Sequence, residues 1–283
     1  MKGIINLNKP KGWTSRDAVN KVRNILHVRD CGHMGTLDPQ GEGVLLIGVG
    51  KATRLFNALL EKDKLYQATF KFGYETDTLD GDGKIMKTST RIPSLQEIKE
   101  ILPHHCGEIL QIPPAYSAKS INGVRAYNLA RNGKEVKLNP SLVKIYSIEV
   151  ADNNIQDEYT FCVHCSAGTY IRSICRDIAY ELDTFATMTS ITRLRAGEFS
   201  IENAHTIDDI ERLKSDALIP LEIALSEFPR YDVPSDKYRE LLNGIKLEAP
   251  RINALFTVYC NGELFGLGEN IDGILKIKTY LKD

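Results

Sequence analysis

Residues 32–39 (GHMGTLDP) combine residue types suited to covalent catalysis more densely than any other stretch of the chain. Gly32 and Gly35 allow the backbone to turn tightly or to approach a ligand closely. Pro39 favours an extended conformation at the residue before it, which would hold the Asp38 carboxylate in one direction. A carboxylate held in this way can act as a nucleophile. Taken alone, the same pattern more often marks an ordinary turn.

The segments around this stretch predict a mixture of helices and strands. A capping box at residues 14–17 predicts a helix start, and a second at 94–97 predicts a short helix that Pro103 closes. Residues 64–72 alternate in polarity, which predicts a half-buried strand with Tyr66 on its apolar side. Other strands are predicted at residues 44–47, 143–150, 159–165 and 195–201, and a helix capped by Thr169 is predicted between the last two. Without regular βαβ alternation, this order favours an α+β fold.

The chain of 283 residues can form one large core or one core with a small second module. Residues 228–234 resemble a linker, and the predicted strands at 255–260, 264–268 and 274–278 indicate a small β-rich module. We therefore predict two domains, residues 1–228 and 229–283. Within the first, proline pairs and Asn-Gly turns around a short helical stretch at 124–130 predict a mobile excursion over residues 113–140.

The formal net charge of −1 hides an uneven distribution of charge. Residues 1–54 carry nine basic and four acidic side chains, whereas residues 202–227 carry two basic and seven acidic ones. This segregation fits a basic RNA-binding face, and it fits ordinary solvated helix faces equally well. The sequence shows neither a signal peptide nor an apolar stretch long enough to span a bilayer, so we expect a cytoplasmic protein without membrane contact.

Three stretches partly match metal-binding or nucleotide-binding motifs, but each lacks a required feature. The spacing of Cys162, His164 and Cys165 suggests zinc, but alternation along a strand would turn the two cysteines to opposite sides, and we expect all six cysteines to be free. Residues 43–51 lack the lysine of a phosphate-binding loop. The acids at 77, 80 and 82 lack the ligand and glycine pattern of a calcium loop. No metal is expected.

Several blocks of sequence resemble, in the same order, those of the bacterial tRNA pseudouridine-55 synthase family. The match covers roughly residues 3–205, and a coincidence of many blocks is far more specific than any single motif. The blocks are residues 8–15 (NKPKGWTS), 32–39, 43–54, 64–66 (KLY), 73–80 (GYETDTLD), 113–119 (PPAYSAK), 168–173 (GTYIRS) and 193–199 (RLRAGEF).

The resemblance implies a mixed, mainly antiparallel catalytic sheet of pseudouridine synthase type and a PUA-like C-terminal module that binds RNA. It also implies the activity, which is isomerisation of the T-loop uridine at position 55 of tRNA to pseudouridine. The reaction adds and removes no atoms, so no cofactor is expected, and the expected partner is the T arm of tRNA. We expect a monomer.

The resemblance also assigns roles to individual residues. Asp38 would be the nucleophile, and Arg172 would pair with it, orient it and favour its ionised state. Tyr66 would stack on the target base, and its hydroxyl could take part in proton transfer. Each residue has a structural alternative: Asp38 could sit in a plain turn, Arg172 could be a surface cation, and Tyr66 could belong to the core.

The remaining expected residues bind the substrate. His33 would occupy the space vacated by the flipped base, and Tyr170 and Ile191 would line the base pocket. The candidate phosphate contacts are Lys9, Lys11, Arg54 and Lys119, and residues 113–140 would close over the RNA.

The chain departs from the family pattern at Ile191 and Thr192, where a leucine and an arginine are usual. This departure concerns RNA docking rather than the chemistry. The rival interpretation is a non-catalytic T-arm RNA-binding protein or tRNA chaperone. The presence of Asp38, Tyr66 and Arg172 counts against it, because binding alone requires none of them.

Overall fold

The computed structural model describes residues 1–283 except 118, 122–123, 126, 128–137 and 283. Its main sheet has nine strands, and the antiparallel pairs outnumber the single parallel pair, between β3 and β12. The strand order is β1 (Gly3–Lys9), β3 (Glu42–Val49), β12 (Ala186–Ala196), β4 (Lys64–Phe72), β11 (Glu158–Cys165), β10 (Ser141–Asp152) and β7 (Gly107–Gln111). Two short strands extend it, β2 (Cys31–His33) beside β3 and β13 (Phe199–Ser200) beside β12. The α+β class and the mainly antiparallel sheet are therefore confirmed.

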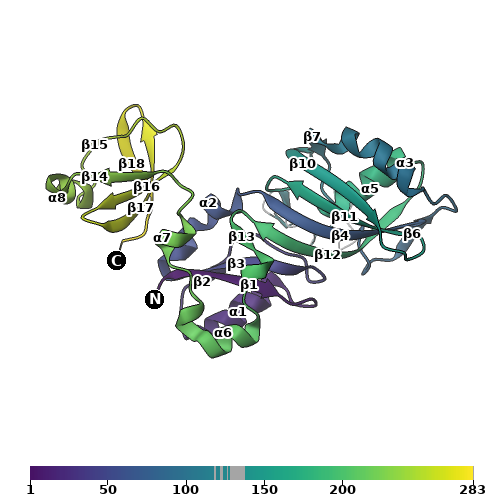
Figure 1. Cartoon of the computed structure of the whole chain (residues 1–283), viewed down its shortest axis with the longest axis horizontal. Coiled ribbons are helices and arrows are strands. Elements are labelled where there is room, and N and C mark those ends of the chain that lie inside the picture. The colour runs from purple at the N-terminus through teal and green to yellow at the C-terminus, as the bar shows by residue number, and fades with distance from the viewer. Residues whose placement is uncertain (118, 122–123, 126, 128–137, 283) are drawn as a thin grey trace.

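Helices pack on the sheet (Figure 1). The side chains between the helices and the sheet are apolar. The helices α1 (Ser15–Leu26) and α6 (Ile207–Leu213) lie near β1, whereas α3 (Leu95–Ile101) and α5 (Ile171–Glu181) lie near β10 and β11. One core joins both groups, and it contains Val22 of α1, Ile178 of α5 and the stacked rings of Phe70 and Phe161. Among the described residues, no helix combines the length and apolar character needed to cross a membrane.

Local sequence patterns predicted several elements correctly. Helix α1 begins after the Thr14 cap, and α3 begins after the Ser94 cap, each with the reciprocal bonds of a capping box. Strand β4 spans the predicted residues 64–72, and its burial alternates as expected. The three predicted C-terminal strands are β16 (Phe256–Cys260), β17 (Glu263–Ile271) and β18 (Ile274–Tyr280).

Other predictions were wrong in their boundaries. The range 195–201, expected to be one strand, holds the last two residues of β12, a turn and β13. Strand β12 begins at Ala186 and was missed over most of its length, because a central strand has neighbours on both sides and need not show a clean alternation. The expected linker at 228–234 contains β14 (Arg230–Val233), which pairs in parallel with β16. The cap of α5 is Tyr170 rather than Thr169. Of the predicted helical stretch 124–130, Val124–Arg125 form strand β9, which pairs with β8 (Ser120–Ile121). Most of that stretch lies outside the described residues.

Short elements connect the main ones. They are η1 (Gly50–Leu55), α2 (Phe56–Leu60), β5 (Tyr74–Thr76), β6 (Ile85–Thr88), η2 (Leu102–His105), η3 (Ile201–Asn203), η4 (Lys214–Ala217), α7 (Leu221–Ala224), η5 (Ser235–Lys237), α8 (Tyr238–Leu242) and β15 (Leu247–Glu248).

The C-terminal residues form a five-stranded sheet in the order β14-β16-β17-β18-β15, at one end of the molecule (Figure 1). It has a small core of its own, and it also shares a second core with the main sheet. Leu281, fully buried, joins Leu264 to Ile4 and Leu55 in that shared core. The carbonyl of Leu281 also accepts a hydrogen bond from Lys2 Nζ at 3.2 Å. The last residues of the chain therefore attach this sheet to the main one.

We expect Leu281→Ala to lower the free energy of unfolding by about 2–5 kcal/mol, because it leaves a cavity in the core that the two sheets share. The measurement is urea unfolding followed by circular dichroism. Ile271→Ala is the matched control, since that side chain is 41% exposed at the end of β17. A change below about 0.5 kcal/mol for Leu281→Ala, the size usual for surface substitutions, would contradict the shared core.

Candidate active site

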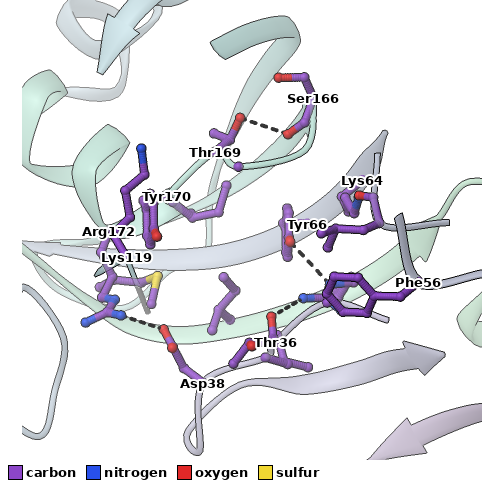
Figure 2. Close-up of a pocket in the computed structure, with 18 residues that line it drawn as sticks. Thr36, Asp38, Phe56, Lys64, Tyr66, Lys119, Ser166, Thr169, Tyr170 and Arg172 are labelled. Carbon is purple, nitrogen blue, oxygen red and sulfur yellow. Dashed lines mark hydrogen bonds and ion pairs between the residues drawn. The ribbon is translucent and has the colours of Figure 1, made fainter. Parts of the chain in front are cut away.

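A cavity of about 330 Å³ opens between the main sheet, the loop after β2 and the start of α5 (Figure 2). Segments that are far apart in the sequence contribute to its walls. Six of the residues predicted from the sequence line it: Asp38, Tyr66, Lys119, Tyr170, Arg172 and Ile191. The convergence of a carboxylate, a phenol and a guanidinium in one cavity is therefore a feature of the structure.

Asp38 and Arg172 form an ion pair at this cavity. Arg172 Nη2 lies 2.9 Å from Asp38 Oδ2. The arginine side chain is 7% exposed, whereas the Asp38 side chain is 40% exposed. The pair therefore leaves the carboxylate accessible while the cation that orients it is buried.

The Arg172 guanidinium has three further acceptors. Nη1 donates to the carbonyl of Thr78 at 3.0 Å and to Asp80 Oδ2 at 3.1 Å, and Nη2 donates to the carbonyl of Tyr116 at 3.1 Å. A buried guanidinium is stable only when its charge is paired and its N–H groups are bonded. These contacts fix both the position and the direction of the charge that faces Asp38.

Asp80 is a site residue that sequence reasoning missed, because neither the rejected calcium loop nor the 73–80 block assigned it a role in the site. Burial raises the pKa of the Asp80 carboxyl group, and bonds from Thr78 and the charge of Arg172 oppose that rise. Thr78 Oγ1 donates to Asp80 Oδ1 at 2.6 Å. Its position at the end of the 73–80 block was the one feature of the sequence that could have indicated a role for Asp80 in the site.

Tyr66 lies on β4 and is 8% exposed. Arg193 Nε donates to its hydroxyl oxygen at 3.2 Å, and the other guanidinium nitrogens donate to the carbonyls of Val44 at 3.1 Å and Thr36 at 2.7 Å. Burial raises the pKa of the Tyr66 phenol, so the hydroxyl stays protonated at neutral pH. Arg193 was also missed, although it begins the 193–199 block and lies opposite Tyr66 in the β12–β4 register.

The loop that carries Asp38 is fixed by the amino-terminal segment. Ser15 Oγ donates to the carbonyl of Leu37 at 3.0 Å and accepts from the Leu37 N–H at 2.9 Å. The Gly12 N–H donates to the carbonyl of Pro39 at 2.8 Å. The backbone on both sides of Asp38 is therefore bonded to residues 12–15.

Lys9 belongs to the same support, and its burial counts against the phosphate contact predicted for it. The side chain is fully buried, and Nζ donates to the carbonyls of Pro10 at 2.9 Å and Trp13 at 2.7 Å. Burial lowers the pKa of Lys9 to about 8. A lysine held beneath a loop cannot reach a phosphate on the surface.

The other expected substrate contacts lie in different places. Lys119 lines the cavity and donates to the Ser141 hydroxyl. Lys11 is exposed and lines a smaller neighbouring cavity of about 170 Å³. Arg54 is exposed and donates to the carbonyl of Tyr280 at 3.0 Å, in the C-terminal sheet. His33 lies on β2, outside the residues that line the 330 Å³ cavity, and burial lowers its pKa.

Two pocket residues are positioned by their elements. The backbone of Tyr170 is held by the Gln111 side chain, which accepts from the Tyr170 N–H at 2.8 Å and donates to its carbonyl at 3.1 Å. Ile191, on β12, is 7% exposed. Both residues line the cavity, Tyr170 from the start of α5 and Ile191 from strand β12 of the sheet.

The disfavoured metal and nucleotide sites have other structural roles. Cys165 is buried in the core, with its pKa raised to about 11, whereas Cys162 points to the other side of β11, as the alternation predicted. His164 pairs with Asp63. In the described part of the chain, no group of three or more His, Cys, Asp or Glu residues is arranged to hold a metal ion. Residues 43–51 form most of β3 and the start of η1.

Comparison with known proteins agrees with this geometry. Residues 23–171 match the model of the TruB family pseudouridylate synthase N-terminal domain. The chain is 40% identical to tRNA pseudouridine synthase B of Clostridium tetani, over 99% of this chain and 100% of the relative. It is 35% identical to the protein of the same name from Aquifex aeolicus, again over 99% of this chain and 100% of the relative.

Solved structures give the same result for the fold. A chain in the structure of a Cbf5-Nop10-Gar1 complex superposes with a TM-score of 0.76 at 26% identity, covering 98% of this chain and 84% of that one. A chain in an H/ACA RNP bound to a substrate RNA containing 2′-deoxyuridine superposes with a TM-score of 0.74 at 25% identity, covering 99% and 85%. From the family match, the full-length relatives and this fold, the chain belongs to the TruB family of pseudouridine synthases.

Proposed function

We propose that this protein converts the T-loop uridine at position 55 of tRNA to pseudouridine, with Asp38 as the nucleophile. The observation that carries the proposal is the meeting of Asp38, Arg172 and Tyr66 in one cavity of about 330 Å³. A cavity of this size suits one extruded nucleobase with part of its ribose. Membership in the TruB family and the names of the full-length relatives support a tRNA substrate.

The reaction is an isomerisation in which atoms are conserved. Asp38 attacks either the ribose C1′ or the uracil ring, and the bond between N1 and C1′ breaks. The freed base rotates, and a carbon–carbon bond forms between C5 and C1′. The proton on C5 is removed, N1 gains a proton, and release of the carboxylate regenerates Asp38. The balance requires no external reductant, oxidant or group donor.

The neighbouring side chains have distinct roles in this scheme. Arg172 orients the Asp38 carboxylate through the ion pair at 2.9 Å. Tyr66 stacks on the base, and its protonated hydroxyl, fixed by Arg193, serves the proton transfers. Tyr170 and Ile191 bound the base from α5 and β12.

Binding requires the uridine to leave the T loop, at a cost of a few kcal/mol. We propose that Lys119 and Lys11, which border the two adjoining cavities, contact the phosphates that flank the flipped nucleotide. His33 is proposed to fill the vacated space in the RNA. Residues 229–283 are proposed to form a second RNA-binding module on the catalytic unit 1–228, within a cytoplasmic monomer.

Substitution of Asp38 tests the proposed nucleophile. Asp38→Asn removes the attacking carboxylate and keeps its size, so we expect pseudouridine formation to fall by at least about 10⁴-fold. We expect the affinity for a T-arm stem-loop to change by less than about 1 kcal/mol, since Asp38 repels phosphate rather than binding it. Product is mapped by carbodiimide modification and primer extension, and affinity is measured by filter binding.

The matched control for this test is Asp216→Asn, an exposed acid on η4. Purified protein is incubated with the stem-loop in the absence of metal and nucleotide. Undiminished product from Asp38→Asn would refute the proposed nucleophile. If neither the wild-type protein nor the control forms product, and both still bind the RNA, the result would instead favour a non-catalytic T-arm binding protein.

Two substitutions separate the two roles of Tyr66. Tyr66→Phe keeps the ring and removes the hydroxyl, so we expect kcat to fall by about 10²–10⁴-fold while KM changes little. Tyr66→Leu removes stacking as well and should also raise KM. Both variants are compared by single-turnover kinetics, after thermal melting has verified that they fold. A Tyr66→Phe variant with kcat within about twofold of wild type would exclude proton transfer by the phenol.

A further inference from the structure

Phe56 is an aromatic side chain at the catalytic cavity that the reaction scheme leaves without a role. It is the first residue of α2, it lines the cavity, and it is 40% exposed. In Figure 2 it lies with Lys64 on one side of the pocket, whereas Asp38 and Arg172 lie on the other. The cavity therefore extends past Tyr66, away from the nucleophile.

The exposure of Phe56 is fixed by the helix that carries it. Leu55 and Leu59, its neighbours on η1 and α2, are almost fully buried in the core shared by the two sheets. Leu55 and Leu59 are four residues apart and share the face that points into the core. Phe56 and Leu60 share the adjacent face, and both line the cavity. The ring is thus held at the cavity by a backbone that the core anchors, and it cannot withdraw without disturbing that core.

The cavity wall around Phe56 is apolar where it is open. Leu60 adds an apolar surface to the same cavity. Lys64 is 6% exposed, burial lowers its pKa to about 8, and its ammonium donates to the carbonyls of Leu60 and Lys62, so it supports this wall from within. An exposed aromatic face beside an apolar surface suits a nucleobase.

We propose that Phe56 is a stacking platform for the nucleotide adjacent to the flipped uridine. The proposal rests on the proposed function, since it places the target base against Tyr66 and Asp38. Extruding one nucleotide draws its neighbours toward the mouth of the pocket, where the exposed ring of Phe56 lies. Stacking of a base on an aromatic ring contributes about 1–3 kcal/mol and tolerates any base. Phe56 therefore adds affinity and positions the substrate without taking part in the chemistry.

The test uses a T-arm stem-loop with 2-aminopurine placed immediately 5′ or 3′ of the target uridine, because its fluorescence is quenched by stacking. The protein carries Asp38→Asn so that the RNA stays unreacted. We expect quenching at one of the two positions with Phe56 present. Phe56→Leu keeps an apolar side chain but removes the π face, so it should weaken binding by about 5- to 150-fold and abolish the quenching. Phe56→Trp should restore both.

Steady-state kinetics give a second readout, measured in protein that keeps the native Asp38. Phe56→Leu should raise KM by a similar factor, with the loss falling on KM much more than on kcat. Ile155→Ala is the matched control, because that side chain is 56% exposed in the turn before β11, at the opposite end of that strand from Ser166. If Phe56 were only an apolar wall, Phe56→Leu would leave KM and RNA affinity unchanged.

The outcomes separate this proposal from the proposed function. Unchanged KM, affinity and quenching for Phe56→Leu, in a protein that makes pseudouridine, would overturn the stacking platform alone. Quenching that depends on Phe56, in a protein that binds the stem-loop but makes no pseudouridine, would support the platform and refute the proposed activity.

Discussion

The candidate site depends on the ion pairs and hydrogen bonds of the buried Arg172 guanidinium. It joins three segments that are distant in sequence: the Asp38 loop, the turn at Thr78–Asp80 and the backbone at Tyr116. A buried cation without partners would cost several kcal/mol, so the native state is favoured only when all three segments converge. The same requirement that stabilises the buried charge also aims the carboxylate of Asp38. Stability and the proposed chemistry are therefore coupled at one side chain.

Much of the positive charge near the amino terminus supports the structure. Lys9 is buried beneath the Asp38 loop, and Arg54 and Lys2 donate to carbonyls at the end of the chain. An ammonium or guanidinium group that donates to backbone carbonyls satisfies acceptors that would otherwise be unpaired. The excess of basic residues in this region is therefore a poor measure of its RNA-binding surface. Of the expected phosphate contacts, Lys11 and Lys119 remain proposed, because their side chains border the cavities.

The central strands of the sheet make the cavity rigid. Tyr66 of β4 lies opposite Arg193 of β12, and the hydrogen bond between their side chains spans two paired strands. Strand β12 also carries Ile191. Residues placed on strands that are paired on both sides have little freedom to move, which suits the proposed role of holding a flipped base in one orientation. The mouth of the cavity is formed instead by short elements, among them α2 with the exposed ring of Phe56.

The sequence by itself determined the local elements and the main chemical candidates. Capping boxes placed α1 and α3, alternation placed β4, and the matching blocks identified Asp38, Tyr66 and Arg172. Tertiary structure alone decided which charges meet: Asp80 pairs with Arg172 across 92 residues, and Arg193 reaches Tyr66 across 127. Helix caps and alternation depend on neighbours within a few residues, whereas burial and ion pairing depend on how distant segments pack. For that reason the sequence could not show that Lys9 is buried or that Phe56 is exposed.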